Sequence, residues 1–254
     1  MRRLLFATVL LAPLAAMAAQ PCKFEAPRKL QLDLAGVRAV QIDVNSNDLH
    51  LAATDGAPVV EGRACASEQN VLDSLQITQR RDGDQLLIDI GGGHGFSINV
   101  FGSSYSNLEV GMKLPANLPV TVRVGSGDAE VEGLQALQAH VGSGDLHVRH
   151  IAGRFGASVG SGDIDASDLG SFELGSAGSG DVTAERIKGG ARVGSVGSGD
   201  VTLRQVGGNV RVDTLGSGDL EVSDVAGDLS LGALGSGDVD HSGVKGKVSL
   251  PRDS

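Results

Sequence analysis

The sequence predicts an all-β protein built as a parallel β-solenoid, a coil in which equivalent strands of successive turns stack on one another. Two observations predict this fold. The tetrapeptide Gly-Ser-Gly-Asp recurs seven times at nearly constant spacing, and the residues between recurrences alternate between aliphatic and polar. A structural module can recur along a chain, whereas a catalytic loop has no reason to, so the repeat indicates a structural role for the tetrapeptide. We expect a right-handed β-helix.

The repeat has a period of 17 to 19 residues, and we call one period a rung. Successive intervals between the closing aspartates are 17, 18, 18, 19, 19 and 19 residues. These aspartates are Asp128, Asp145, Asp163, Asp181, Asp200, Asp219 and Asp238. Such regularity over more than a hundred residues excludes a single active-site loop.

Each rung reads as a turn, a strand, a second turn and a second strand. In the rung "GSGDVTLRQVGGNVRVDTL", aliphatic residues alternate with polar ones, stop at residues 207–209, and resume from Val210 to Leu215. Period-two alternation with β-branched residues predicts strands. With no helix to return the chain, equivalent strands of neighbouring rungs can only stack in parallel.

Glycine at the corners has two candidate explanations. A tight corner needs either positive φ or close approach to the identical corner one rung away, about 4.8 Å along the axis, and glycine tolerates both. We call the Gly-Ser-Gly-Asp tetrapeptide the Asp corner and the glycine-rich turn opposite it the second corner.

Stacked Asp corners raise an electrostatic question. Carboxylates about 4.8 Å apart repel by roughly 1 kcal/mol per neighbouring pair even at the dielectric constant of water. We expect each aspartate to accept hydrogen bonds from the amides of its own turn or from the preceding serine hydroxyl. The alternative is a calcium row on the same seven aspartates, as in nonapeptide coils. Those coils have two such corners per rung and a different Gly–Asp spacing, so we favour the structural role.

The N-terminal part predicts a β-rich cap that merges into the coil. The segment "VNSNDLHL" parallels "VGSGDLHV", with Asn45 and Asn47 in place of glycine, so residues 45–48 predict a degenerate rung. Residues 67–75 could form a short helix, and residues 75–90 predict a hairpin around an Asp-Gly-Asp turn. We expect a signal peptide at 1–18, the cap at 19–117, and regular repeats at 118–254, with cap and coil as one continuous domain.

Export is predicted by the first 18 residues, which carry two arginines, an apolar run and small residues before Ala18. The mature protein would then lie in the periplasm or be secreted, with no later membrane segment or anchor. An oxidising compartment favours a disulfide between Cys22 and Cys65. It would close a loop of about 44 residues and could stabilise the fold by roughly 4 kcal/mol in the chain-entropy model.

The charge balance argues against nucleic acid and anionic membranes as partners. The chain has a net charge of −10, and loss of Arg2 and Arg3 would leave 19 basic against 31 acidic residues. An acidic surface repels phosphate backbones and anionic lipids.

Candidate catalytic or metal-binding groups are few. Residues 91–95, "GGGHG", lack the Lys-Ser/Thr of a phosphate loop, so we expect a strand connection. His147 and His150 lie three residues apart on a strand and should point to opposite faces, which argues against a metal site with His140. We expect no cofactor.

Aromatic residues, which sugar-cleaving β-helix enzymes use as binding platforms, are scarce. Phe155 and Phe172 are the aromatic residues of the repeats, and Phe96, Phe101 and Tyr105 form a cluster that we expect to serve core or cap packing. We therefore expect no enzyme.

The combination "LEVGMKLPANLPVTVRVGSGDAEVEG" and the following Gly-Ser-Gly-Asp rungs resembles a bacterial family of exported β-helix domains, over roughly Val40 to Leu250. The family is labelled putative adhesin, or putative auto-transporter adhesin with a head GIN domain. The resemblance implies a parallel β-helix in the cell envelope and no particular activity. We expect a structural or adhesive envelope protein that contacts an envelope glycan or protein. The alternatives are a calcium-binding repeat protein and, less favoured, a polysaccharide-active enzyme.

Overall fold

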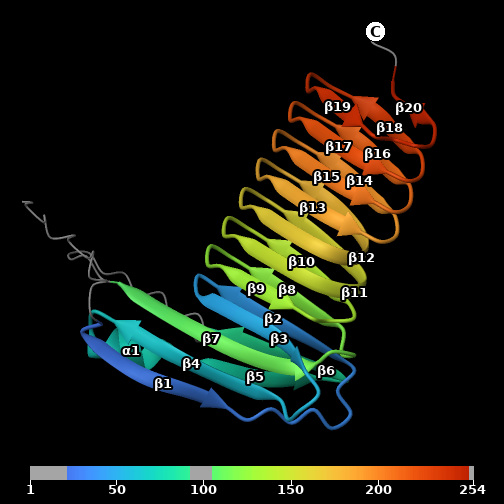
Figure 1. Ribbon diagram of the computed structural model, residues 1–254. Coiled ribbons are helices and arrows are strands. Elements are labelled where there is room, and N and C mark those ends of the chain that lie inside the picture. The colour runs from blue at the N-terminus through green and yellow to red at the C-terminus, as the bar shows by residue number, and fades with distance from the viewer. Residues whose placement is uncertain (1–21, 92–104, 252–254) are drawn as a thin grey trace, which may run out of the picture.

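The protein consists of a parallel β-coil seated on a β-rich cap (Figure 1). The computed structural model describes residues 22–91 and 105–251. The proposed signal peptide at 1–18, most of the "GGGHG" segment, and Phe96 and Phe101 lie outside the described residues.

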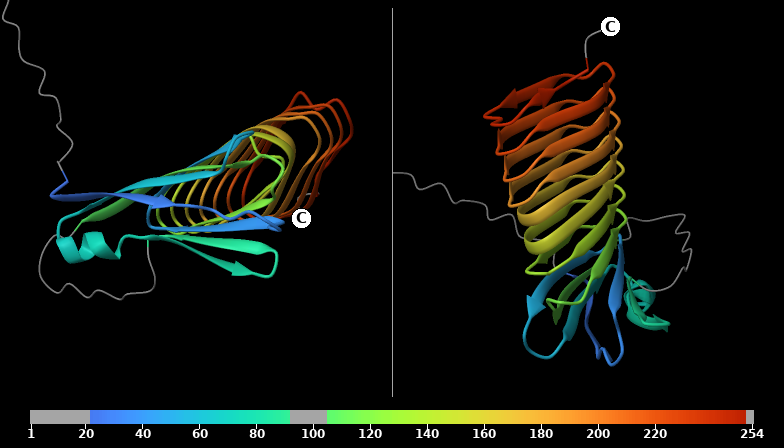
Figure 2. Two further views of the ribbon diagram at one scale, coloured as in Figure 1. Left: turned by 90° about the horizontal axis from the view of Figure 1, so that it is seen from below. Right: turned by 90° about the vertical axis from the view of Figure 1, so that its right-hand side faces the viewer.

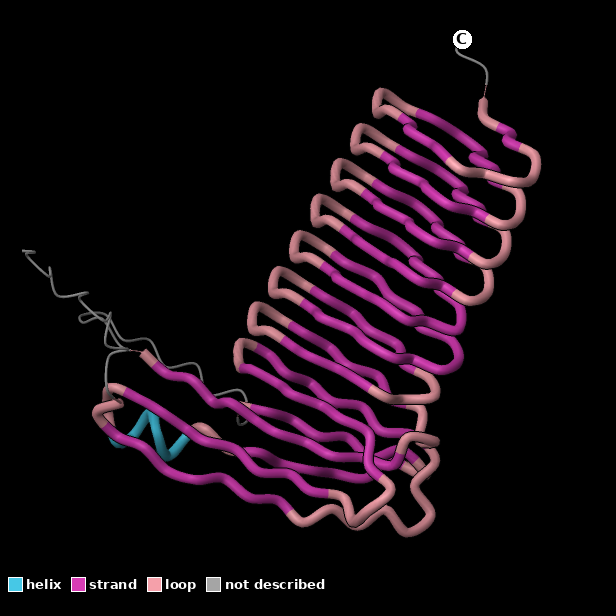
Figure 3. The backbone as a smooth tube through the Cα atoms, viewed as in Figure 1, coloured by secondary structure: helices cyan, strands magenta, loops and turns pink. Residues whose placement is uncertain are grey.

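Two sheets make up the coil, and each rung contributes one strand to each sheet (Figure 3). The strands that follow the Asp corners form the first sheet: β9 (Ala129–Glu132), the first part of β11 (Leu146–Val159), the first part of β12 (Ile164–Ala177), β13 (Val182–Ile187), β15 (Val201–Val206), β17 (Leu220–Val225) and β19 (Val239–Ser242). The second sheet contains β8 (Val120–Val124), β10 (Leu137–Val141), the remainders of β11 and β12, β14 (Ala191–Val196), β16 (Val210–Leu215), β18 (Leu229–Leu234) and β20 (Val248–Ser249).

Equivalent strands of neighbouring rungs pair in parallel and in register. Val182 aligns with Val201, which aligns with Leu220, and the second sheet repeats this with Ala191, Val210 and Leu229. The predicted parallel β-solenoid with rungs of 17–19 residues is therefore confirmed. Seen nearly end-on, each rung is a flattened loop (Figure 2).

Aliphatic ladders fill the space between the two sheets. In the rung from Val201 to Leu215, the inward residues are the first, third and sixth of each strand, with exposures of 0 to 1%. Burying one Val or Leu side chain stabilises a fold by roughly 1.5–3 kcal/mol. Stacking is what completes this burial, because a single rung leaves both of its edges uncovered.

Strict period-two alternation is wrong in both sheets, because the inward residues are the first, third and sixth, and in the first sheet left-handed backbone is the cause. The fifth residue after the aspartate of each Asp corner has left-handed backbone, which turns the chain so that the sixth residue faces inward, as Val206 does after Gln205. The residues of this left-handed column are Gly133, His150, Asp168, Arg186, Gln205, Asp224 and Gly243, with φ between 54° and 79°.

Positive φ is not the reason for glycine at the Asp corners, because no glycine of the seven tetrapeptides has it. Close approach is the reason. A Cβ atom added to Gly199 would overlap the carbonyl oxygen of Gly180 in the rung below, and Gly218 stands in the same relation to Gly199. These corners stack backbone on backbone, with no room for a methyl group.

The described part of the cap is a mixed sheet with one short helix. β1 (Phe24–Leu30), β4 (Val59–Ala66) and β7 (Ser106–Pro115) pair antiparallel, and β5 (Ile77–Asp82) forms a hairpin with β6 (Gln85–Ile90). The helix α1 spans Gln69–Ser74. The predicted helix and hairpin are confirmed.

The cap joins the coil through the degenerate rung. Its strands β2 (Ala39–Asn45) and β3 (Asp48–Thr54) pair in parallel with β8 and β9 of the coil on one side and with β6 and β7 on the other. The predicted rung at residues 45–48 is therefore confirmed.

Asn45 and Asn47 replace glycine for different reasons. Asn45 has left-handed backbone, with φ of 58°. Asn47 instead uses its side chain, which is 6% exposed: its Nδ2 donates to the carbonyl oxygen of Ile90 at 3.0 Å, and its Oδ1 accepts from the amide of Leu108 at 3.2 Å. Asn47 thereby satisfies backbone groups at the closed, N-terminal end of the coil.

Candidate functional site

The outward surface of the first sheet, together with the adjoining strands β3 and β7, carries columns of polar and charged side chains, and we call it the charged face. Three shallow depressions of about 550, 460 and 370 Å³ lie along it. The largest lies over β15, β17 and β19 and includes Asp219, Glu221 and Asp240. The smallest lies over β3, β7, β9 and the start of β11 and includes His50 and Glu130. Neither sequence pattern nor spacing singled out this surface, because its residues differ from rung to rung.

Ion pairs link neighbouring rungs across the charged face. Arg204 contacts Glu221 at 3.1 Å on one side and Glu185 at 3.6 Å on the other. Arg186 reaches across to Asp168 at 3.0 Å, and this hydrogen bond holds the pKa of the Asp168 carboxyl below its ordinary value. Pairs this exposed contribute little stability, about 0–1 kcal/mol each. Their main effect is to fix the positions of the charges.

The histidines do not lie as expected. His147 and His150 both point outward on the charged face, because the left-handed backbone at His150 interrupts the alternation. Their ring nitrogens lie 3.4 Å from Asp165 and 3.8 Å from Asp168, respectively. His140 lies on the second sheet, where its Nδ1 is 2.8 Å from the hydroxyl of Ser158. The three rings therefore do not converge.

The aspartates of the Asp corners brace neighbouring rungs. In six successive pairs, one Oδ1 accepts a hydrogen bond from the amide of the aspartate in the next rung, at 2.8 to 3.3 Å. Our expectation of acceptance within the same turn was wrong, since the stacking places the next amide within reach. The second corner repeats the device: the amide of Asp228 donates to Oδ1 of Asn209 at 2.9 Å.

This geometry predicts different effects for two substitutions of Asp181. Asp181→Ala removes the acceptor of the Asp200 amide and should destabilise the protein by about 1 kcal/mol. Asp181→Asn keeps an acceptor oxygen, as Asn209 does, and removes one charge from the column, so its free energy of unfolding should stay within about 0.5 kcal/mol of the wild type or rise. Urea denaturation of both variants checks the assignment. Equal losses would show that the charge, rather than the acceptor, matters.

Metal binding has no preformed centre in the described ranges, 22–91 and 105–251. No group of three or more His, Cys, Asp or Glu side chains there could hold a metal ion. One oxygen of each braced carboxylate is already engaged by an amide. We therefore predict that a chelator leaves the melting temperature unchanged and that calorimetry detects no calcium binding. A calcium-dependent rise of about ten degrees would instead establish the calcium row.

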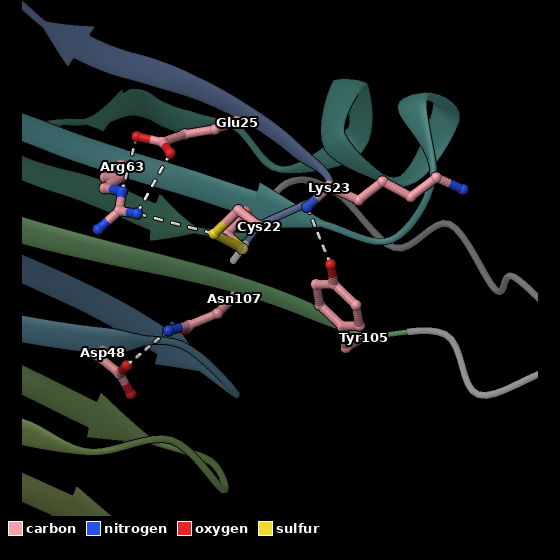
Figure 4. The surroundings of a disulfide bond; sticks show 8 residues. Cys22, Lys23, Glu25, Asp48, Arg63, Tyr105 and Asn107 are labelled. Carbon is pink, nitrogen blue, oxygen red and sulfur yellow. Dashed lines mark hydrogen bonds and ion pairs between the residues drawn. A yellow bond between two sulfur atoms is a disulfide. The ribbon is translucent and has the colours of Figure 1, made fainter. Parts of the chain in front are cut away.

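The disulfide joins Cys22 to Cys65, as predicted, with 5.5 Å between the Cα atoms (Figure 4). It lies where β1 enters the cap beside β4. On one side of it, Arg63 contacts Glu25 at 2.8 Å. On the other side, the hydroxyl of Tyr105 accepts from the amide of Lys23 at 3.0 Å. Tyr105 thus serves cap packing, while it remains 41% exposed.

Both aromatic residues of the repeats lie in the core. Phe155 and Phe172 are 0 and 2% exposed, and their ring centroids are 5.6 Å apart. They therefore fill the coil and offer no exposed stacking surface to a sugar.

Across the part of the chain that the structure describes, no helix has the length and apolar character needed to span a membrane.

Comparison with known proteins gives a family match and structural neighbours. The profile of the family Toastrack DUF4097 matches residues 37–240. A structure described as "Putative lipid binding protein" from Parabacteroides distasonis ATCC 8503 is 17% identical, with a TM-score of 0.54 over 91% of this chain and 98% of that one. A "putative adhesin" from the same strain is 18% identical, with a TM-score of 0.49 over 90% of this chain and 97% of the other. Among curated proteins, no match was found.

Proposed function

The chain belongs to the Toastrack family, DUF4097, and from that premise we propose that it is an exported, non-catalytic protein of the cell envelope with a structural or adhesive role. The observation that carries the proposal is the charged face. It presents charged side chains on every rung, several of them held in ion pairs, so an extended partner can make several charged contacts along the coil.

Repetition favours attachment because many weak contacts add up. When two or more rungs engage an extended partner at once, each further contact is intramolecular and the overall avidity exceeds that of one contact. The rung spacing of about 4.8 Å suits a regularly repeating polymer or an extended protein segment. We propose an envelope glycan or protein as the partner.

The disulfide supports an exported location. The disulfide Cys22–Cys65 suits an oxidising compartment, the periplasm or the exterior. The division proposed here is a signal peptide at 1–18, a cap at 19–117 and a coil at 118–254.

A non-catalytic role is supported by how the conspicuous residues are used. The aspartates brace the rungs and the phenylalanines of the repeats are buried, whereas glycan cleavage needs a pair of free carboxyl groups flanking a bound sugar. Incubation with envelope polysaccharides should therefore release no new reducing ends. Their release at a rate that depends on the protein would overturn this part of the proposal.

A binding experiment with two matched variants tests the adhesive role. Arg149→Gln/Arg204→Gln removes two cations of the charged face, while Arg192→Gln/Arg211→Gln removes two ion-paired arginines of the second sheet. We expect the wild type and the second-sheet variant to bind immobilised envelope glycans and cell-surface fractions equally, and the charged-face variant to bind at least tenfold more weakly. Equal binding by both variants would exclude the charged face, and no binding by the wild type would contradict adhesion.

A further inference from the structure

The last rung differs from the rungs that precede it. Its strands β19 and β20 pair only with β17 and β18, so in the part of the chain that the structure describes their outer edges have no strand partner (Figure 1). An open edge of a sheet offers unpaired amide and carbonyl groups to any other strand. The N-terminal end is closed by Asn47 and the cap strands, whereas no cap strand covers this end within residues 105–251.

The side chains of this rung break the aliphatic ladders. The third position of the first-sheet strands is aliphatic in six successive coil rungs, but His241 occupies it in the last rung, directly above Val222. The aliphatic residues of that ladder are Val131, Val148, Ala166, Ala184, Leu203 and Val222. A neutral imidazole has one donor and one acceptor nitrogen, so covering it costs free energy unless both find partners.

Charged residues flank the same edge. Lys245 and Lys247 lie in the second corner of the last rung, where the equivalent positions one rung below are Ala226 and Asp228. Both lysines are exposed. The strands are also short, four residues in β19 and two in β20. Short strands, lysines and polar side chains at inward positions are the features by which natural sheets prevent edge-to-edge pairing.

We propose that the last rung is a stop, in which His241 and the lysines of the second corner prevent two copies of this chain from joining through their open edges. If two copies joined at this edge, the imidazole of His241 would be buried and the lysine ammonium groups would lose water. The few hydrogen bonds between two short strands would not offset that cost. Because the other end of the coil is closed, failure of the stop should give dimers and no longer polymers.

Two matched double variants test the stop. His241→Val/Lys245→Thr makes the third position of the last rung aliphatic and removes one of its two lysines. His147→Val/Lys188→Thr makes the same chemical changes further from the end of the coil, with Lys188 in the same second-corner column as Lys245. We expect monomers for the wild type and the mid-coil variant in sedimentation velocity over 5–500 µM. This range would detect a dimer with a dissociation constant of about 100 µM. The edge variant should shift to a species of twice the mass.

Hydrogen exchange locates the contact. In the dimer, amides of β19 and β20 should gain at least tenfold protection, while β13 and β15 should be unchanged. A second variant, Lys245→Thr/Lys247→Thr, keeps His241 at the third position. It should therefore dimerise more weakly than His241→Val/Lys245→Thr. Monomers for every variant with unchanged circular dichroism, or a wild type that is already dimeric through this edge, would overturn the stop.

Discussion

Replacing Gly199 by alanine is expected to destabilise the coil by on the order of 3–5 kcal/mol, the upper range for single substitutions. The added Cβ would overlap the carbonyl oxygen, and approach the carbonyl carbon and amide nitrogen, of Gly180 in the rung below. Backbone cannot rotate away as a side chain can, so two rungs would have to separate and lose hydrogen bonds between their corners, such as the one from Gly199 N–H to Gly178 O at 3.3 Å.

Gly175→Ala is the matched control within the same coil. A Cβ atom there would lie 3.6 Å from the carbonyl oxygen of Ala157, an ordinary van der Waals contact. We expect a change within about 0.5 kcal/mol, since Gly175 is exposed and has no left-handed backbone. Urea denaturation followed by circular dichroism compares the two variants. Similar midpoints would contradict the stacking of backbone on backbone at the Asp corners.

Removing the disulfide by Cys22→Ser/Cys65→Ser should have the second largest effect, a loss of about 4 kcal/mol in the chain-entropy model for a separation of 43 residues. The loss should be confined to the cap, because the coil strands contact only neighbouring rungs. Hydrogen exchange with mass spectrometry should show faster exchange in β1 and unchanged protection in β15 and β17. Equal acceleration in β15 would mean that cap and coil unfold as one cooperative unit.

The coil could be predicted from sequence because its rules are repeated in every rung. The aliphatic residues at 201, 203, 206, 210, 212 and 215 are all buried, and the nearly constant interval between aspartates indicates which strands pair. The disulfide, the short helix and the hairpin at Gly83 were also predictable, from local chemistry. How β4 and β7 pair in the cap was not, since that depends on contacts between distant segments without a repeated pattern.

The left-handed column was missed for a physical reason. Left-handed backbone is usually signalled by glycine or asparagine, but five of its seven positions carry other residues, such as Arg186 and Gln205. The spacing does not reveal it either, because the gap of three between Leu203 and Val206 recurs between Val212 and Leu215 in the second sheet, which has no left-handed residue there. Because of this column, the histidine positions were wrongly assigned.

The bond between Asp corners was missed because sequence does not distinguish an acceptor for its own turn from an acceptor for the next rung. Both use the same residue at the same place in a turn. Only the stacking distance, which brings the Asp200 amide to 2.9 Å from Oδ1 of Asp181, decides between them. The charged face was missed for a similar reason, because its ion pairs join residues of different rungs.

The left-handed column also sets how freely this surface can change. A residue other than glycine in this conformation costs roughly 1–2 kcal/mol, so each such side chain is retained at the expense of stability. A side chain in this column lies outside the core, as that of Gln205 does, so replacing it leaves the aliphatic ladders untouched. The coil therefore has one position per rung whose side chain can be exchanged without disturbing the core. New binding specificities can arise there, by selection or by design, with glycine available wherever stability has to be regained.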